Sequence, residues 1–111
     1  MVGGSSADTL IGGAGVDEFR FGIFSDSSPS ATDRIADFAP GVDHIALPGA
    51  RGIVTYVFIG TGAFTGTANE VRFFSADGVT TIEVRQLGNS VNDMEIDLTG
   101  IVALTAADFL F

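Results

Sequence analysis

Apolar and polar residues alternate with a period of two through much of the second half of the chain, which is the spacing of a half-buried β-strand. The alternation runs through EVRFFS (70–75), TTIEVRQ (80–86) and DMEIDL (93–98). The preceding stretch IVTYVFI (53–59) is β-branched and aromatic, and it also predicts a strand. The tail LTAADFLF (104–111) is compatible with one helical turn before a short apolar end. This half of the chain is therefore predicted to be β-structure.

One hairpin register satisfies both faces of the two central strands. With 76–79 as the loop, apolar residues face each other on one side and opposite charges face each other on the other. The strand at 93–98 adds three apolar residues to the first face and an acidic row to the second. We predict an antiparallel meander with one buried face. The apolar pairs are Val71–Val84 and Phe73–Ile82, and the charged pairs are Arg72–Glu83 and Glu70–Arg85.

Further apolar residues of these strands are expected to belong to the core rather than to a lipid pocket. They form a stripe that consists of Val57, Ile59, Phe64, Phe73, Ile82 and Ile96.

The first part of the chain carries a different pattern, a nonapeptide repeated in tandem. GGSSADTLI (3–11) is followed directly by GGAGVDEFR (12–20). The second copy matches G-G-x-G-x-D-x-U-x, with U apolar, at every fixed position, and the first departs only at Ser6. This nonapeptide is the calcium-binding β-roll repeat of RTX proteins. The chain therefore resembles that family.

The resemblance implies a parallel β-roll in which two repeats make one coil. Glycines permit tight turns, the aspartate supplies negative charge, and calcium lies between successive turns on the same side. The next stretch, FGIFSDSSP (21–29), keeps only Gly22 and Asp26 of the motif, so the repeat ends there. Because a single coil cannot bury a core, we expect this coil to be the last of a longer roll. The candidate calcium residues in the repeats are Gly4, Ser6, Asp8, Gly13, Gly15 and Asp17.

A second resemblance follows the repeats. DRIADFAPGVDHIAL (33–47) is similar to the segment after the roll in the C-terminal domain of serralysin-type (peptidase M10) metalloproteases. Ala46 stands where that family usually has aspartate. The resemblance makes Asp37 and Asp43 candidate ligands of a final calcium ion, and solvated loop carboxylates are the alternative. The implied architecture is all-β: the last coil of a calcium-binding parallel β-roll (1–24), continuous with a capping and secretion-signal region (25–111) that forms an antiparallel meander or sandwich.

The charge balance is strongly acidic. Ten Asp and four Glu stand against five Arg, with no Lys and no Cys, which gives a net charge of -9. Nucleic acids and anionic membranes need dense positive charge and are not expected partners, whereas calcium is. The sequence also lacks an apolar run long enough to span a bilayer, and Met1 is not followed by a secretory signal peptide.

No catalytic site is expected in this chain. His44 is the only histidine, so an H-E-x-x-H zinc helix is absent, and no G-x-S-x-G turn accompanies it. Glu83, Glu95 and Asp97 fall on the outward face of the meander and predict a solvated surface. Any catalytic domain would lie outside these residues.

The function implied by the resemblance is a non-catalytic, calcium-binding C-terminal module of a secreted, extracellular RTX protein. Its partners would be calcium, an upstream domain and, transiently, a type I secretion system that reads the acidic and apolar end AADFLF (106–111). The alternatives are an accessory module for polysaccharide binding, as in alginate epimerase-type rolls, and the C-terminal part of a secreted metalloprotease. The net charge of -9 would repel an anionic polymer.

Overall fold

The computed structural model describes residues 8–22, 27–28, 31–49, 54–89 and 91–110. Among these residues, no helix is long and apolar enough to cross a membrane. The described elements are β1 (Thr9–Leu10), β2 (Glu18–Arg20), β3 (Asp33–Ile35), β4 (His44–Ala46), β5 (Tyr56–Phe58), β6 (Asn69–Ala76), β7 (Val79–Arg85), β8 (Met94–Thr99), the 3-10 helix η2 (Ala106–Asp108) and β9 (Phe109–Leu110).

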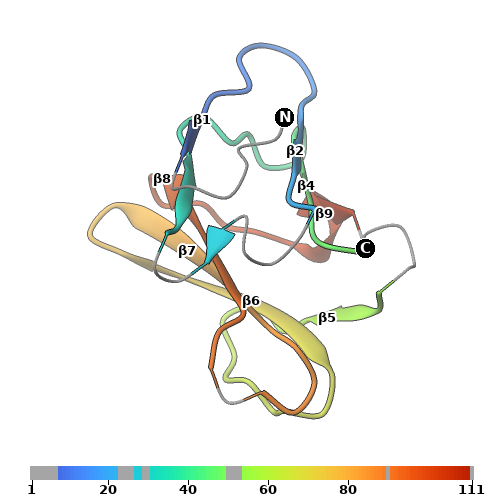
Figure 1. The fold of residues 1–111 in the computed structure, drawn as a ribbon. Coiled ribbons are helices and arrows are strands. Elements are labelled where there is room, and N and C mark those ends of the chain that lie inside the picture. Colours follow the sequence, from blue (N-terminus) through green and yellow to red (C-terminus); the bar gives the residue numbers. More distant parts are fainter. Residues whose placement is uncertain (1–7, 23–26, 29–30, 50–53, 90, 111) are drawn as a thin grey trace.

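Within the described residues the strands form two sheets (Figure 1). The six-stranded sheet has the order β1-β3-β8-β7-β6-β5, and the three-stranded sheet has the order β2-β4-β9. The β6–β7 and β7–β8 pairs are antiparallel, and all other pairs are parallel. The all-β prediction is therefore confirmed, with both sheet types present.

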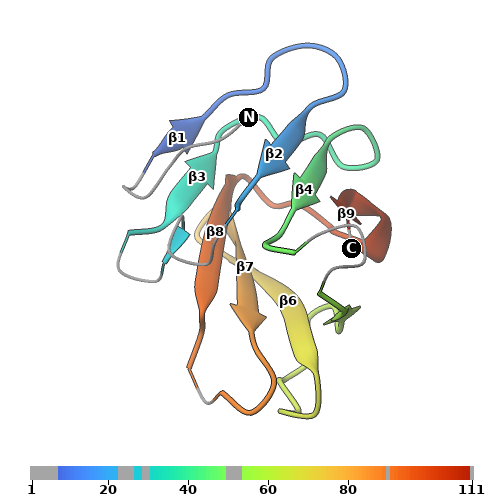
Figure 2. The same cartoon turned by 45° about the vertical axis from the view of Figure 1, so that its right-hand side comes forward.

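The parallel pairs stack successive coils of the chain. β1 and β2 make one coil, and β3 and β4 lie beside them in the same order, with Leu10 opposite Ile35 and Phe19 opposite Ile45. β8 then lies parallel to β3, and β9 lies parallel to β4 (Figure 2). The glycine motif ends after the first coil, but the parallel stacking continues into two more layers.

The predicted meander is present as β6, β7 and β8. Each predicted hairpin pair, from Glu70–Arg85 to Ser75–Thr80, has the expected register. The connection is shorter than the predicted four-residue loop, because Ala76 pairs with Val79 and only Asp77 and Gly78 form the turn. Both turn residues have positive φ, 54° and 75°, as the favoured two-residue hairpin turns require.

One apolar core joins the coils to the meander. Its members come from both sheets, so the two parts are packed as one unit. The side chains that are fully buried include Phe19, Phe21, Ile35, Ile45, Leu47, Val71, Ile82, Val84, Met94, Ile96 and Leu98.

The predicted apolar stripe was wrong at β5 and at Phe64, whose ring lies against Arg72 and Arg85 on the outer face of the meander. Val57 is 44% exposed, whereas Tyr56 beside it is buried. The Tyr56 hydroxyl donates to the Pro48 carbonyl at 2.5 Å, which satisfies its polar end inside the core. The parallel pairing with β6 determines which side chains of β5 point into the core. This pairing could not be predicted from the residues of β5 alone.

Candidate metal site in the glycine turns

The turn of the second repeat, between β1 and β2, needs its glycines for two different reasons. Gly13 and Gly15 have φ values of 79° and 88°, in the left-handed region that side chains disfavour. Gly12 instead makes room for a neighbour, because a Cβ there would lie 2.5 Å from Asp17 Oδ2 and 2.9 Å from Phe19 Cζ. The motif therefore brings the Asp17 carboxylate directly against the turn backbone.

The Asp17 carboxylate is the most unusual group of this turn. Its Oδ2 atom is buried and has no hydrogen-bond partner among the described residues. A buried carboxylate oxygen is costly unless a donor or a cation contacts it. The backbone of Asp17 is well bound, since its N–H donates to Asp43 Oδ1 at 3.0 Å and its carbonyl accepts from His44 N at 2.9 Å.

Asp37 lies in the next coil and binds the backbone of the same turn. Its two carboxylate oxygens accept the backbone N–H groups of Gly12 at 2.9 Å and Gly13 at 2.7 Å. The Gly12 bond, followed by the Gly13 bond, lowers the pKa of Asp37 below its usual value of 3.8. This carboxylate therefore stays ionised and holds the glycine turn in place.

Asp43 and Asp108 repeat one arrangement in successive coils. Asp43 accepts the N–H of Asp17 in the coil above and the N–H of Ala39 in its own turn, both at 3.0 Å. Asp108, 2% exposed, accepts Gly41 N from the coil above and Thr105 N from its own turn, both at 2.8 Å. Carboxylates thus link the stacked turns through backbone amides.

The other side of the coils shows a related contact. Asp33 Oδ1 accepts the N–H of Asp8 at 2.8 Å, across 25 residues of sequence. Asp8 Oδ2 is buried without a hydrogen-bond partner in the described part of the chain. The candidate residues Gly4 and Ser6 lie outside the described residues.

Asp37 and Asp43 are thus bonded to the turn that holds Gly13 and Asp17, whereas Asp8 lies on the other side with Asp33. In the described residues, no group of three or more His, Cys, Asp or Glu side chains surrounds a common point. Calcium accepts backbone carbonyl oxygens as well as carboxylates. The partnerless Asp17 oxygen beside a left-handed glycine turn fits a calcium ligand, while both oxygens of Asp37 and of Asp43 are already engaged by amides.

Sequence reasoning missed three residues of this arrangement. Asp33 belongs to the matched segment but was not considered as a turn residue, and Gly12 was not distinguished from the other glycines. Asp108 was considered only as part of an export signal. The sequence around Asp108 does not indicate a turn of the roll, because η2 carries Ala106 and Ala107 in place of a glycine repeat.

Comparisons with known proteins agree with this geometry. The family model "Peptidase M10 serralysin C terminal" matches residues 1–111. A metallopeptidase, AprA of Pseudomonas marginalis, is 39% identical over 89 residues, which is 78% of this chain and 18% of that protein. The solution structure of the AlgE6R3 subunit of the Azotobacter vinelandii mannuronan C5-epimerase superposes with a TM-score of 0.65 at 31% identity, over 98% of this chain and 60% of that one. The AlgE6R2 subunit of the same enzyme gives 0.59 at 28% identity, over 97% and 67%.

Stacked parallel coils with carboxylate-bridged turns, closed by an antiparallel meander, define the class: an all-β module of the kind found in these epimerase subunits. The chain belongs to the peptidase M10 serralysin C-terminal domain family. It spans about a fifth of the length of the curated metallopeptidase it matches. The family model describes the non-catalytic C-terminal domain of these peptidases.

Proposed function

We propose that this chain is a calcium-binding C-terminal module that folds outside the cell and caps the β-roll of a larger secreted protein. The observation that carries the proposal is the buried, partnerless Oδ2 of Asp17 inside a glycine turn. Asp17, with carbonyl oxygens of its turn, would hold the ion. Asp37 and Asp43 would fix the turn below it, and Asp8, Gly4 and Ser6 would serve the equivalent turn on the other side.

Calcium would supply the positive charge that the module lacks. Fourteen acidic side chains against five arginines repel one another in a compact state. Calcium sites in extracellular modules have dissociation constants of about 10⁻⁴ to 10⁻³ M, so the sites would be largely empty at cytosolic calcium levels. Folding would then be coupled to arrival outside the cell.

The proposal also assigns the parts of the chain and its partners. Residues 1–24 would end the roll and residues 25–111 would cap it and carry the signal for a type I secretion system. The first coil shares both sheets with the later coils, which supports one continuous unit. The upstream domain would be that of a metalloprotease or another secreted enzyme.

A thermal melt tests the calcium proposal. A ligand that binds only the native state at tenfold above its dissociation constant adds about 1.4 kcal/mol. We therefore expect the midpoint in EDTA to rise by several degrees in millimolar calcium, and magnesium at the same concentration to give a much smaller rise. Equal midpoints in EDTA and in calcium would refute the calcium-dependent role.

A second candidate function is binding of an extracellular polysaccharide. The observation that favours it is the match of almost the whole chain to subunits of a mannuronan C5-epimerase. The net charge of -9 opposes binding along a polyanion, so any contact would have to be local. Affinity electrophoresis in gels that contain an acidic or a neutral polysaccharide tests this function directly.

A further inference from the structure

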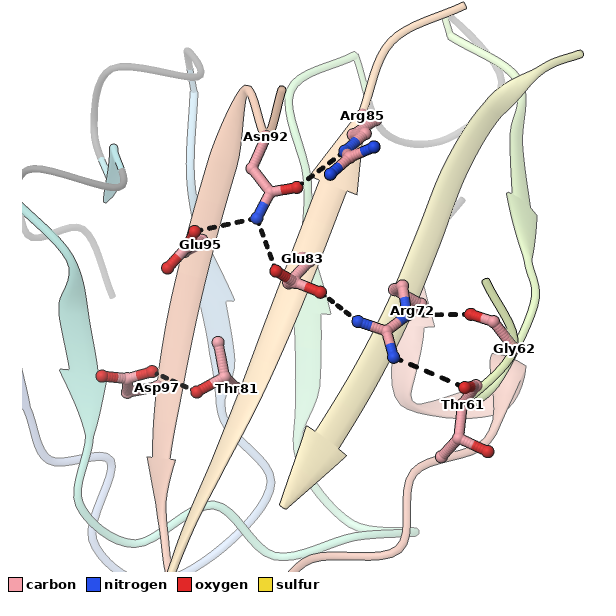
Figure 3. Close-up of polar contacts among 9 residues, drawn as sticks. All are labelled: Thr61, Gly62, Arg72, Thr81, Glu83, Arg85, Asn92, Glu95 and Asp97. Atoms are coloured by element: carbon pink, nitrogen blue, oxygen red, sulfur yellow. Dashed lines mark hydrogen bonds and ion pairs between the residues drawn. The ribbon is translucent and has the colours of Figure 1, made fainter. Parts of the chain in front are cut away.

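The outer face of the meander holds a cavity of about 370 Å³, far from the glycine turns in sequence and covered on one side by the connection between β5 and β6. Two of the chain's five arginines and a carboxylate line it (Figure 3), together with an aromatic ring. The lining residues are Thr61, Ala63, Phe64, Arg72, Glu83 and Arg85.

Arg72 lines this cavity and is held in place by bonds to its neighbours. Its Nε donates to the Gly62 carbonyl at 2.8 Å, and one terminal nitrogen reaches the Thr61 carbonyl at 3.4 Å. Its other terminal nitrogen pairs with the Glu83 carboxylate. All three nitrogens of the guanidinium are therefore engaged, and Arg72 ties the β5–β6 connection to the sheet.

Arg85 differs because its cross-strand partner faces elsewhere. The register places Glu70 opposite Arg85, but the Glu70 carboxylate accepts from Thr65 N at 2.9 Å and Gly66 N at 3.0 Å. Arg85 Nε donates to Asn92 Oδ1 at 2.8 Å, and its guanidinium carbon lies 4.4 Å from the centre of the Phe64 ring. The two terminal nitrogens make no hydrogen bond to a described residue, and Figure 3 shows Nε as the nitrogen that bonds Asn92.

The chemistry of the cavity selects a ligand with a single negative charge. A guanidinium fork with both terminal nitrogens available, held by an aromatic face, matches the two oxygens of a carboxylate. The nearby Glu83 and the net charge of -9 disfavour doubly charged phosphates and long polyanions. The Glu83 carboxylate already accepts from Arg72 and Asn92, and its remaining lone pairs can accept from a hydroxyl group. The volume lies at the small end of ligand pockets, about 300–1,000 Å³.

We propose that this cavity binds a hexuronate, either as a free sugar acid or as the terminal residue of a polysaccharide, with Arg85 gripping its carboxylate. Glu83 accepts a hydrogen bond from one of its hydroxyl groups. The proposal rests on the second candidate function and gives it a location and a ligand class. It does not depend on calcium binding at the glycine turns.

Amide and guanidinium NMR of the full chain tests the proposal, with sodium galacturonate as the probe and glucose as the neutral control. We expect saturable shifts at 61–64 and at the Arg85 Nε–H, with glucose giving none. Arg85→Gln should weaken binding at least tenfold. The matched control is Arg20→Gln, which removes the same charge from β2, where Arg20 pairs with Glu18 at 2.9 Å. Arg20→Gln should leave binding unchanged.

Further variants and probes separate the possible failures. If Arg85→Gln does not fold, Arg85→Lys keeps the charge but removes the fork and should still weaken binding. If an oligogalacturonate binds no more tightly per chain end than the monosaccharide, the cavity binds the terminal residue. Much tighter binding would show that internal residues are bound. Equal losses in the Arg85 and Arg20 variants, or shifts elsewhere, would overturn the pocket. Polysaccharide binding that survives Arg85→Gln would overturn the pocket but leave the second function standing. No uronate binding at all would overturn the pocket, and the second function falls with it if gels that contain a neutral polysaccharide also show no retardation.

Discussion

At the scale of single residues, aspartates do much of the structural work in this chain by accepting backbone amides. Asp33, Asp37, Asp43 and Asp108 each bond an N–H group of the preceding coil. The sequence pointed to Asp37 and Asp43 through a family resemblance, but their partners could not be read from it. The amides that bond Asp37 and Asp43 lie 24 to 26 residues earlier in the chain, on the same side of the coils. This separation is set by the path of the chain and not by any local pattern.

The two repeat aspartates should differ in their effect on calcium binding. Asp17 lies in the complete motif, against a turn that Asp37 supports, whereas Asp8 lies in the copy with Ser6 in place of glycine. We expect Asp17→Ala to reduce the calcium-dependent stabilisation more than Asp8→Ala does. Calorimetric titration of both variants measures this difference. A larger loss in the Asp8 variant would place the main site on the opposite side of the coils.

Glu70 should make stability depend on pH. The Thr65 hydroxyl bond, with the amide bonds of Gly66 and Thr65, lowers the pKa of Glu70 below 4.5 in the folded state. A lowered folded pKa stabilises the protein above the unfolded pKa, and this contribution is lost as the pH falls through the folded value. Glu70→Gln should therefore destabilise the protein at pH 7 and make little difference at pH 3.

Urea unfolding in EDTA at both pH values checks this prediction. The exposed turn residue Asp77 provides a control. Asp77→Asn removes a carboxylate that accepts no hydrogen bond from a described residue, and asparagine tolerates the positive φ of this position. A Glu70→Gln effect that persists unchanged at pH 3 would contradict the role of the ionised carboxylate.

At the scale of elements, β8 belongs to two arrangements at once. It is the last strand of the antiparallel meander and also the parallel neighbour of β3. Its alternating pattern predicted the first role, with Met94, Ile96 and Leu98 on the apolar face of the meander. The second role could not be predicted from the sequence. Pairing with β3 requires the same buried apolar residues as pairing with β7, and Ile96 and Leu98 are apolar in either role.

Asp108 should stabilise the last coil. Asp108→Ala would remove the carboxylate that accepts the amides of Gly41 and Thr105, and a hydrogen bond to a charged group contributes about 1.5–3 kcal/mol. Asp108→Asn retains one acceptor oxygen and should cost less. The urea midpoint in EDTA measures both losses, and Asp77→Asn is the control because asparagine keeps the positive φ of that turn. Unchanged stability in the Asp108→Ala variant would show that η2 and β9 do not contribute to the cooperative unit.

At the scale of the whole molecule, the resemblance and the hydrophobic pattern predicted the fold class, but not how far the coils extend. The glycine repeats suggested that the roll stops near residue 24, whereas parallel pairing continues through β3–β4 and β8–β9. The turn of the second coil keeps one left-handed glycine, Gly41 with a φ of 78°, but not the repeat. The later coils close their turns with Asp43 and Asp108, which a repeat search does not detect.

The C-terminal end should act in export before the domain folds. Asp108 and Phe109 are buried in the folded chain, so a transporter could read them only in an unfolded chain. A passenger fused to this chain should be secreted by cells that carry a matched type I exporter, and deletion of 108–111 should abolish secretion. Secretion that survives the deletion would refute the role of this end. Failure of the intact fusion would count against the proposed export function itself.

The position of β8 between β3 and β7 also determines when this protein can begin to fold as it leaves the ribosome. The N-terminal strands emerge first, but their neighbour in the larger sheet is made only at residues 94–99, and the smaller sheet waits for 109–110. Neither sheet can close while these segments remain in the exit tunnel. Pairings over such long sequence separations also form slowly. The order of synthesis therefore delays closure of both sheets until residues 94–99 and 109–110 have emerged.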